Sequence, residues 1–356
     1  MAATALAATG ADSPLVAQAI TAARSIDGFG VDVDATLSWC VEVGRSAPFI
    51  GEGRTRELWE LLAATAAVDV AAARVLEPHL DALSILRQAA SAFDHDDVSD
   101  GVGASASSAW GVFAAEGAGK RLEAQHGADG WRLHGTKPWC SLAAHLTHAL
   151  VTASLDGGQR QMFAVNLRSS GVRPHAGPWV ARGLPNVVSA DVDFDDVLAV
   201  PVGDAGWYLK RPGFAWGGMS VAACWWGAAM PLADSLLAAA SSDRADQVAL
   251  AHLGTVDQAM WAARSALVEA SGLVDDGQSA SIGERLLANR VRGIVFAAAT
   301  RALSETDAAL GPLPLVADEQ HARRIADLHL YLRQHHGLRD AERIGRALVD
   351  AVGESR

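Results

Sequence analysis

The residues best suited to chemistry lie in the stretch 130–141, GWRLHGTKPWCS, where alternating apolar and polar residues lead into an aromatic ring and a hydroxyl. Such alternation is typical of a half-buried β-strand. Gly135 and Pro138 are expected to end the hydrogen-bond ladder of this strand. Trp139 then offers a rigid apolar plane, and Ser141 can donate or accept a hydrogen bond beside it. The stretch predicts a strand end that presents a ring and a hydroxyl to a ligand, with a buried Trp beside an ordinary Ser as the alternative.

Two other stretches look reactive but lack part of the pattern that their chemistry needs. The acidic run 94–97, DHDD, has no second His or carboxylate pair at ligand spacing, which favours a solvated loop over a metal site. The segment 117–120, GAGK, lacks the first glycine and the following Ser or Thr of a phosphate-binding loop. The sequence also contains no GxSxG or HExxH motif. We therefore expect no metal site and no serine-hydrolase chemistry.

The composition indicates a large, mainly helical globular protein. Half of the 356 residues are apolar, a fifth are charged, and alanine is abundant. The formal net charge of -12 disfavours a nucleic acid partner. Cys40, Cys140 and Cys224 form no CxxC pair, which is typical of a reducing compartment. Because no apolar run reaches ~18 residues and no basic segment precedes the Ala-rich start, we expect a cytoplasmic protein with no membrane partner.

Residues 1–107 have the pattern of a helical domain. The strongest helix is expected at 55–76, where leucines and valines recur near helical spacing and alanines fill positions at which helices can approach closely. Pro78 is expected to break or kink this helix before it continues through the leucines beyond. Shorter helices are expected at 14–24 and 34–44.

Residues 108–204 have the pattern of a compact β domain. The segment 156–158, DGG, lies between two apolar runs and is a strong hairpin signal. Glycine and proline punctuate the whole region, which suits short strands and turns. Strands are expected at 110–114, 121–125, 130–134, 146–155, 161–167 and 190–197.

Residues 205–356 return to helical periodicity. Several long apolar helices in succession indicate an antiparallel bundle, and a Gly-Pro pair at 311–312 divides two of them. Helices are expected at 217–240, 253–273, 281–309, 322–333 and 340–352. The predicted fold class is α+β, mainly α, with an N-terminal helical domain, a small central β domain and a C-terminal four-helix bundle.

This order of domains, together with three local motifs, resembles the acyl-CoA dehydrogenase family from about Trp59 onward. The stretch 135–141, GTKPWCS, is similar to the family's Gly-Thr-Lys-x-Trp motif and the Ile-Thr pair that follows it. The stretch 113–119, FAAEGAG, is similar to a Phe-Ala-x-x-Glu segment upstream. The stretch 192–201 is similar to a Phe-Asp-x-Val-x-Val-Pro strand downstream. Each motif is weak alone, but three in the right order and spacing are fairly specific.

The resemblance implies an FAD site in a cleft between the β domain and the bundle. Trp139 would flank the isoalloxazine, and Ser141 would hydrogen-bond near its N5 atom. The loop that carries Glu116, Gly117 and Gly119 would lie along the flavin and its pyrophosphate, with backbone amides as donors. In such an enzyme the protein orients the cofactor, and the flavin carries the redox chemistry.

The residues also depart from the family pattern around the cofactor. Lys120 stands where the family has a phosphate-binding Ser, and it could neutralise a pyrophosphate or be an ordinary surface lysine. Ala115 replaces the usual Thr. The resemblance implies that a partner subunit adds an Arg and a Gly-Gly pair to the site; Arg244 stands without its usual Phe-Gly neighbours, and Gly311 keeps one glycine of the pair. The family assembles as a homodimer or homotetramer, and we expect the same here.

The largest departure concerns the catalytic base. The resemblance implies a Glu near the C-terminus, and when Asp327 is aligned with the family's Arg-Asp pair this position falls on His335, within Gln334-His335-His336. A second family position for the Glu falls on Gly217. His335 can serve as the base because imidazole titrates near neutral pH. The alternative is that the two histidines only cap a helix end.

The function that the resemblance implies is FAD-dependent α,β-dehydrogenation of an acyl thioester, with electrons passed to an electron-transfer flavoprotein. A flavin-dependent monooxygenase of the same fold is one alternative. A non-catalytic subunit with a degenerate flavin site that scaffolds a partner is the other, and Ala115 and Gly217 favour it.

Overall fold

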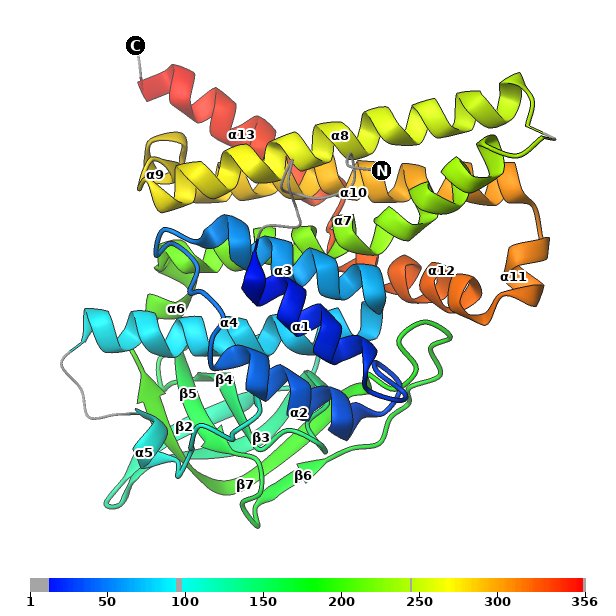
Figure 1. Ribbon diagram of the computed structural model, residues 1–356. Helices are drawn as coiled ribbons and strands as arrows, with labels where there is room; N and C mark the ends of the chain where they lie inside the picture. The colour runs from blue at the N-terminus through cyan, green and yellow to red at the C-terminus, as the bar shows by residue number, and fades with distance from the viewer. Residues whose placement is uncertain (1–12, 94–97, 244, 355–356) are drawn as a thin grey trace.

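The computed structural model describes residues 13–93, 98–243 and 245–354. The acidic run 94–97 and Arg244 lie outside the described residues, so the structure says nothing about them. The β strands form one lobe, and the long helices of the C-terminal half form a bundle on the opposite side of α4 (Figure 1). Domain order therefore follows the sequence prediction: helices, then a small sheet, then a bundle.

The N-terminal helices form as predicted, except at Pro78. That proline lies inside α4 and does not break it. The interruption comes nine residues earlier, at Asp69, which takes an extended conformation and accepts a hydrogen bond from the amide of Ala72. A side-chain cap of this kind begins a new helix, whereas Pro78 only removes one backbone donor. The elements are α1 (Pro14–Arg24), α2 (Val33–Gly44), α3 (Thr55–Val68), α4 (Val70–Ala92) and the short α5 (Val98–Gly101).

The sheet closes on itself. Strand β5 pairs with both β4 and β7, so the pairings β4–β2–β3–β7–β5–β4 form a ring, with β1 added beside β4 and β6 beside β7. The predicted hairpin turn at 156–158 joins β4 to β5. The strands are β1 (Trp110–Phe113), β2 (Leu122–Gly127), β3 (Gly130–Ser141), β4 (His148–Ser154), β5 (Arg160–Asn166), β6 (Val172–Pro174) and β7 (Ser189–Val202).

The prediction that Gly135 and Pro138 end the third strand is wrong. Strand β3 continues to Ser141, and its register with β7 shifts twice, between Leu133 and Gly135 and again between Lys137 and Cys140. Bulges of this kind let a strand bend without ending. Gly135 has a φ of 110°, a conformation that glycine adopts without strain.

The C-terminal bundle is built around α7. This helix packs against α3 and α4 on one side and against α8 and α10 on the other, and two thirds (67%) of its most apolar window is buried. It is long and apolar enough to cross a membrane by length and composition, but its central packing accounts for that apolarity. The elements are α6 (Trp207–Lys210), α7 (Pro212–Ala240), α8 (Gln247–Asp275), α9 (Ser279–Ile282), α10 (Glu284–Leu310), α11 (Leu313–Ala317), α12 (Glu319–Tyr331), η1 (Leu332–Gln334) and α13 (Leu338–Glu354).

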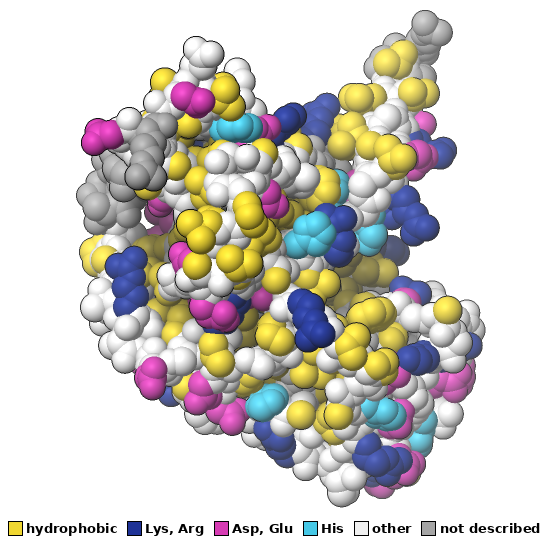
Figure 2. Space-filling model, turned by 90° about the vertical axis from the view of Figure 1, so that its right-hand side faces the viewer, with side chains coloured by type: hydrophobic (Ala, Val, Ile, Leu, Met, Phe, Trp, Pro, Cys, Tyr) yellow, Lys and Arg dark blue, Asp and Glu magenta, His cyan; other side chains and the backbone are white. Residues whose placement is uncertain are grey.

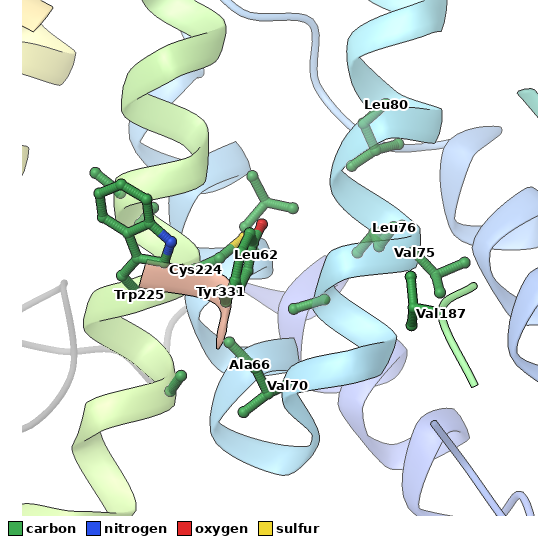
Figure 3. Close-up of a cluster of buried hydrophobic side chains, with 14 of the residues drawn as sticks. Leu62, Ala66, Val70, Val75, Leu76, Leu80, Val187, Cys224, Trp225 and Tyr331 are labelled. Atoms are coloured by element: carbon green, nitrogen blue, oxygen red, sulfur yellow. The ribbon is translucent and has the colours of Figure 1, made fainter. Parts of the chain in front are cut away.

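The core is continuous from the N-terminal helices through the sheet into the bundle. Figure 3 shows its centre, where Tyr331 at the end of α12 lies between α7, which carries Cys224 and Trp225, and α4, which carries Leu76. Burial of large rings at such a junction contributes about 1.5–3 kcal/mol for each fully buried side chain. The segment that follows Tyr331 is therefore fixed against the rest of the fold.

Candidate functional site

The end of β3 presents Trp139 to solvent. Its side chain is 58% exposed, and its φ of 61° lies in the left-handed region that non-glycine residues rarely adopt. The half-buried hydroxyl of Ser141 lies two residues on, 2.7 Å from the hydroxyl of Ser189 and 3.1 Å from a guanidinium nitrogen of Arg74. The exposed ring matches the predicted presentation of Trp139 at a strand end rather than the alternative of a buried Trp, and its strained backbone was not predicted. We call Trp139 and Ser141 the strand-end face.

The loop that carries Glu116 and Gly117 lies against the strand-end face. A Cβ on Gly117 would come within 2.9 Å of the Pro138 ring, so glycine permits this close approach. The Glu116 carboxylate pairs with the buried Lys137 ammonium at 3.1 Å. The Lys137 ammonium also donates a hydrogen bond to the Thr152 hydroxyl at 2.8 Å. Burial lowers the pKa of Lys137, and Glu116 opposes that shift. Glu116 therefore neutralises a buried cation of the Gly-Thr-Lys motif.

The other predicted cofactor residues are less directly placed. Lys120 closes the turn with Gly117 and forms an ion pair with Asp191, so a phosphate would have to compete with that carboxylate. Gly119 occupies the left-handed region of this turn, with a φ of 74°. Gly311 ends α10 in open space, at the corner before α11, and lines none of the cavities described here. Arg244 lies outside the described residues.

A cavity of about 600 Å³ lies between α4, α7, α10 and α13. Gly217, one of the two positions where the family has its Glu, lines it. His336, the last residue of the aligned C-terminal triplet, lines it as well. Its charged walls come from four arginines and three carboxylates, namely Arg211, Arg285, Arg292, Arg343, Glu77, Asp81 and Asp340. We call this space the helical cavity.

Two carboxylates one helical turn apart on α4 enter the helical cavity. Asp81 lies 3.4 Å from the buried guanidinium of Arg211, which also donates to the Gln88 side chain at 2.7 Å. Glu77 is only 8% exposed, and no described residue donates a hydrogen bond to its carboxyl. Burial, and then the charge of Asp81, raise the pKa of Glu77 to about 8. Shifted carboxyl pKa values in a cavity are typical of functional sites.

Arg292 forms the opposite wall of the helical cavity. Its guanidinium donates to the carbonyl of Gly218 at 2.7 Å and to that of Gln334 at 3.0 Å, and it stacks 4.7 Å from the Trp225 ring. The guanidinium is thus fixed by two backbone carbonyl acceptors and by the face of the indole ring. Its positive charge therefore faces the cavity without a carboxylate partner at ion-pair distance among the described residues.

His335 lies behind the wall of the helical cavity. Its ring packs 4.3 Å from Phe296 and 6.3 Å from Trp225. Its Nδ1 atom is 3.3 Å from an Asp340 carboxylate oxygen, but the two are not aligned as a hydrogen bond. Burial lowers the pKa of His335, so its neutral form predominates at neutral pH. His336, by contrast, is largely exposed and lines the cavity.

Arg74 connects the two regions. It lies one turn before Glu77 on α4, contacts the Ser141 hydroxyl, and its guanidinium lies 5.9 Å from the Tyr331 ring. Sequence reasoning missed Arg74, Glu77, Asp81 and Arg292. The available signal was a pair of acidic residues four positions apart within the leucine- and alanine-rich part of a predicted helix, a spacing that places both on one face.

Asp327, the residue from which the position of His335 was counted, is buried at the contact between α12 and the β domain. Its buried carboxylate accepts a hydrogen bond from the backbone amide of Leu184, in the loop before β7. Arg323, one turn earlier on α12, pairs with Asp69 at 2.7 Å. These contacts tie α12 to the β domain and to the start of α4. Asp69, Arg323 and Asp327 also line a second cavity, of about 610 Å³, in which Arg323 pairs with both carboxylates.

No protein-family model and no curated protein matches the chain. Solved structures do match over nearly its whole length. Dibenzothiophene monooxygenase TdsC from Paenibacillus sp. A11-2 is 17% identical, covers 95% of each chain and has a TM-score of 0.73. KijD3 in complex with FMN and a dTDP-amino-keto sugar is 19% identical, covers 99% of this chain and 93% of that one, and has a TM-score of 0.75.

Glutaryl-CoA dehydrogenase from Mycobacterium smegmatis is a third similar structure. It is 17% identical, covers 96% of this chain and 92% of that one, and has a TM-score of 0.74. At these identities the likeness establishes the fold and no more. The chain has the acyl-CoA dehydrogenase fold, as the three motifs predicted.

Proposed function

We propose that this protein is a flavin-dependent oxidoreductase that acts on a small molecule in the helical cavity. The observation that carries the proposal is the exposed, strained Trp139 ring beside the Ser141 hydroxyl, in the fold that TdsC and KijD3 share. A strained backbone persists where the surrounding structure or a ligand stabilises it. A flat ring beside a hydrogen-bonding group suits the plane and the polar edge of an isoalloxazine.

The residues around the strand-end face fit a flavin. Trp139 would stack on the ring system, Ser141 would hydrogen-bond its edge, and the amides of Gly117 and Gly119 would face its phosphate. When bound, the flavin supplies a hydride acceptor. FAD is the form that the motifs imply, while TdsC and KijD3 were solved with FMN. Because Lys120 is paired with Asp191, it is less available to neutralise the diphosphate of FAD. FMN, which has a single phosphate, is therefore the alternative.

The reaction we propose is α,β-dehydrogenation of an acyl thioester. The Arg292 guanidinium, which has no carboxylate partner at ion-pair distance among the described residues, suits a carbonyl oxygen or an anionic group of the substrate. The cavity volume suits a small acyl chain. His335, from its register with the family's Glu, is the proton acceptor that the sequence predicts, and its neutral form would be the working one. In this proposal an electron-transfer flavoprotein accepts the electrons from the reduced flavin. The protein assembles as a homodimer or homotetramer and is cytoplasmic.

A flavin-dependent monooxygenase is the second candidate. It is favoured by the histidines at 335 and 336 in place of a carboxylate and by the structural likeness to TdsC, which is a monooxygenase. The third reading, a non-catalytic subunit, draws on Ala115 and Gly217. The charged groups of the helical cavity weigh against it, because a decayed site has no need to hold buried charges.

Anaerobic mixing of the flavin-loaded protein with a panel of acyl-CoA thioesters separates these functions. A dehydrogenase bleaches its flavin absorbance without oxygen, on addition of one or more thioesters. A monooxygenase shows no bleaching with thioesters, but consumes oxygen when reduced flavin is supplied. A protein that does neither with bound flavin contradicts the proposed enzymatic function.

A further inference from the structure

The carboxylates of α4 enter the space that the family's glutamate on α7 would use. A Cβ built on Gly217 would lie 3.2 Å from an Asp81 carboxylate oxygen. Glu77 lies one turn earlier on α4, on the same face of that helix, and lines the same cavity. A glutamate at Gly217 would therefore meet an existing carboxylate, and the glycine leaves that volume to α4.

Glu77 differs from Asp81 in having no partner. Asp81 is paired with Arg211, whereas Glu77 is 8% exposed as a residue, and its carboxyl, which borders the cavity, receives no hydrogen bond from the described residues. A buried carboxyl without partners costs free energy, and such groups in native proteins are usually satisfied by water or by a ligand. Because Glu77 lines the helical cavity, its carboxyl can contact a ligand that binds there.

We propose that Glu77 is the group in the helical cavity that accepts a proton from the carbon next to a thioester carbonyl. The inference rests on the proposed acyl thioester substrate. In this step the Cα–H bond breaks and a Glu77 Oε–H bond forms. The electron pair of the C–H bond moves into an enolate whose negative charge lies mainly on the carbonyl oxygen, so the step balances without an oxidant.

The charges around Glu77 suit a proton acceptor that works at mildly alkaline pH. Asp81 and Arg74 face it from α4, Arg292 from α10, Cys224 from α7, Tyr208 from α6 and Tyr331 from α12. Burial and Asp81 raise the pKa of its carboxyl, and the two arginines oppose that rise. The carboxylate fraction of Glu77 therefore grows as the pH rises toward about 8. Arg292, a fixed cation on the opposite wall, stabilises the developing enolate.

Glu77 is better placed than His335 for this step. The His335 ring packs on Phe296 and does not line the helical cavity, whereas the carboxyl of Glu77 reaches it. A proton acceptor has to come within hydrogen-bond reach of the proton it removes. A role for His335 in the same step would require its ring to move out from behind Phe296.

Deuterium uptake at C2 of butyryl-CoA and octanoyl-CoA in D₂O tests the inference without depending on flavin turnover. The protein is used as purified and again after flavin is added, and uptake is followed by mass spectrometry. For the wild type we expect exchange above the protein-free background, rising with pH and levelling above about 8. Glu77→Gln, which keeps the side-chain shape, should lower the exchange rate by ~10²-fold or more.

The matched control is Glu52→Gln, which removes an exposed carboxylate that pairs only with Arg87 at the surface. It should leave the exchange rate unchanged. A folded Glu77→Gln protein that exchanges at the wild-type rate overturns the role of Glu77 and leaves the proposed function standing. Absence of exchange in the wild type with both thioesters contradicts the thioester substrate, and with it the inference. Should Glu77→Gln fail to fold, Glu77→Asp replaces it, and an unchanged rate in that variant likewise overturns the role.

Discussion

The strand-end face and the helical cavity differ in how the chain builds them. Trp139 and Ser141 lie two residues apart on one strand, and Gly117, in the loop that packs against Pro138, lies about twenty residues before that proline. The helical cavity takes its charged groups from α4, α7, α10 and α13, which are far apart in the sequence. A local motif can report the first kind of site, whereas only packing reveals the second.

The two regions also differ in electrostatics. Around the strand-end face the polar groups satisfy one another, as in the contacts of Ser141 with Ser189 and of Glu116 with Lys137. In the helical cavity Glu77 is unpaired and its pKa is raised, and Arg292 has only backbone carbonyls as acceptors. The difference fits the proposal that the exposed face binds the cofactor and the cavity carries the proton chemistry. Figure 2 shows that one side of the molecule is hollowed between a projecting helix and the lobe below it.

The largest expected effect separates the two regions by substitution. Glu77→Gln should slow flavin reduction by a thioester ~10²–10⁴-fold, because a general base typically contributes that much to rate. Flavin affinity should stay within a few-fold, since Glu77 lies on the far side of Arg74 from Ser141. Stopped-flow absorbance gives the rate and calorimetry the affinity. Loss of flavin from this variant would show that the regions are one site, against the comparison drawn here.

The next largest effect concerns the contact that holds the regions together. A Cβ on Gly183 would lie 2.0 Å from the backbone carbonyl oxygen of Ala326 on α12. Gly183→Ala should therefore lower the free energy of unfolding by ~2–4 kcal/mol, because neither backbone can yield easily. Gly254→Ala is the control: its Cβ meets nothing within 4 Å on exposed α8, and alanine there should be neutral or slightly stabilising. Chemical denaturation measures both, and equal stabilities for the two variants would contradict the docking.

His335→Ala gives a smaller effect on rate and a sharper choice between the proton acceptors. If Glu77 accepts the proton, the variant should keep flavin reduction within about tenfold of the wild type and lose ~1–3 kcal/mol of stability, since it leaves a gap beside Phe296. The rate should still rise with pH toward about 8. A ~10²-fold loss, together with loss of a pH step below the ordinary histidine pKa, would assign the role to His335.

The last expected effect is on stability as a function of pH. The pKa of Glu77 is about 8 in the folded protein and 4.5 when unperturbed. Between these values the folded state keeps a proton that the unfolded chain has released, so the contribution of Glu77 to stability falls as pH rises through this window. Glu77→Gln removes that dependence. The melting temperature of the variant, relative to wild type, should therefore be higher at pH 8.5 than at pH 5.5, and an equal difference at both would contradict the raised pKa.

Much of the fold could be predicted because its signals are local. Helical spacing gave the bundle helices to within a few residues, and the DGG turn located the β4–β5 hairpin. The predictions of a break at Pro78 and of a strand end at Gly135 were wrong. A helix can continue through a proline when packing compensates for the lost hydrogen-bond donor, and a strand can continue through a glycine by forming a bulge. Both errors came from reading one residue without the tertiary contacts around it.

The candidate site could be predicted only in part, for the same reason. Trp139 and Ser141 were visible because the strand-end motif is contiguous. The hydrogen bond between Leu184 and Asp327 spans more than a hundred residues, and the sequence did not predict it. Glu77 and Arg292 acquire their significance from sharing a cavity, and the only local signal was the spacing of Glu77 and Asp81 on one helix. Roles for His335, Arg244 and Gly311 stay predictions.

Titration of the purified protein with FAD and with FMN, followed by flavin fluorescence, tests the central claim most directly. Trp139→Ala is the matched variant, because its ring is exposed and its loss should not disturb the core. The account predicts saturable quenching by at least one flavin in the wild type and at least tenfold weaker binding in Trp139→Ala. Absence of binding by either flavin in the wild type would contradict it, and equal affinity in the variant would remove the strand-end face from the cofactor site.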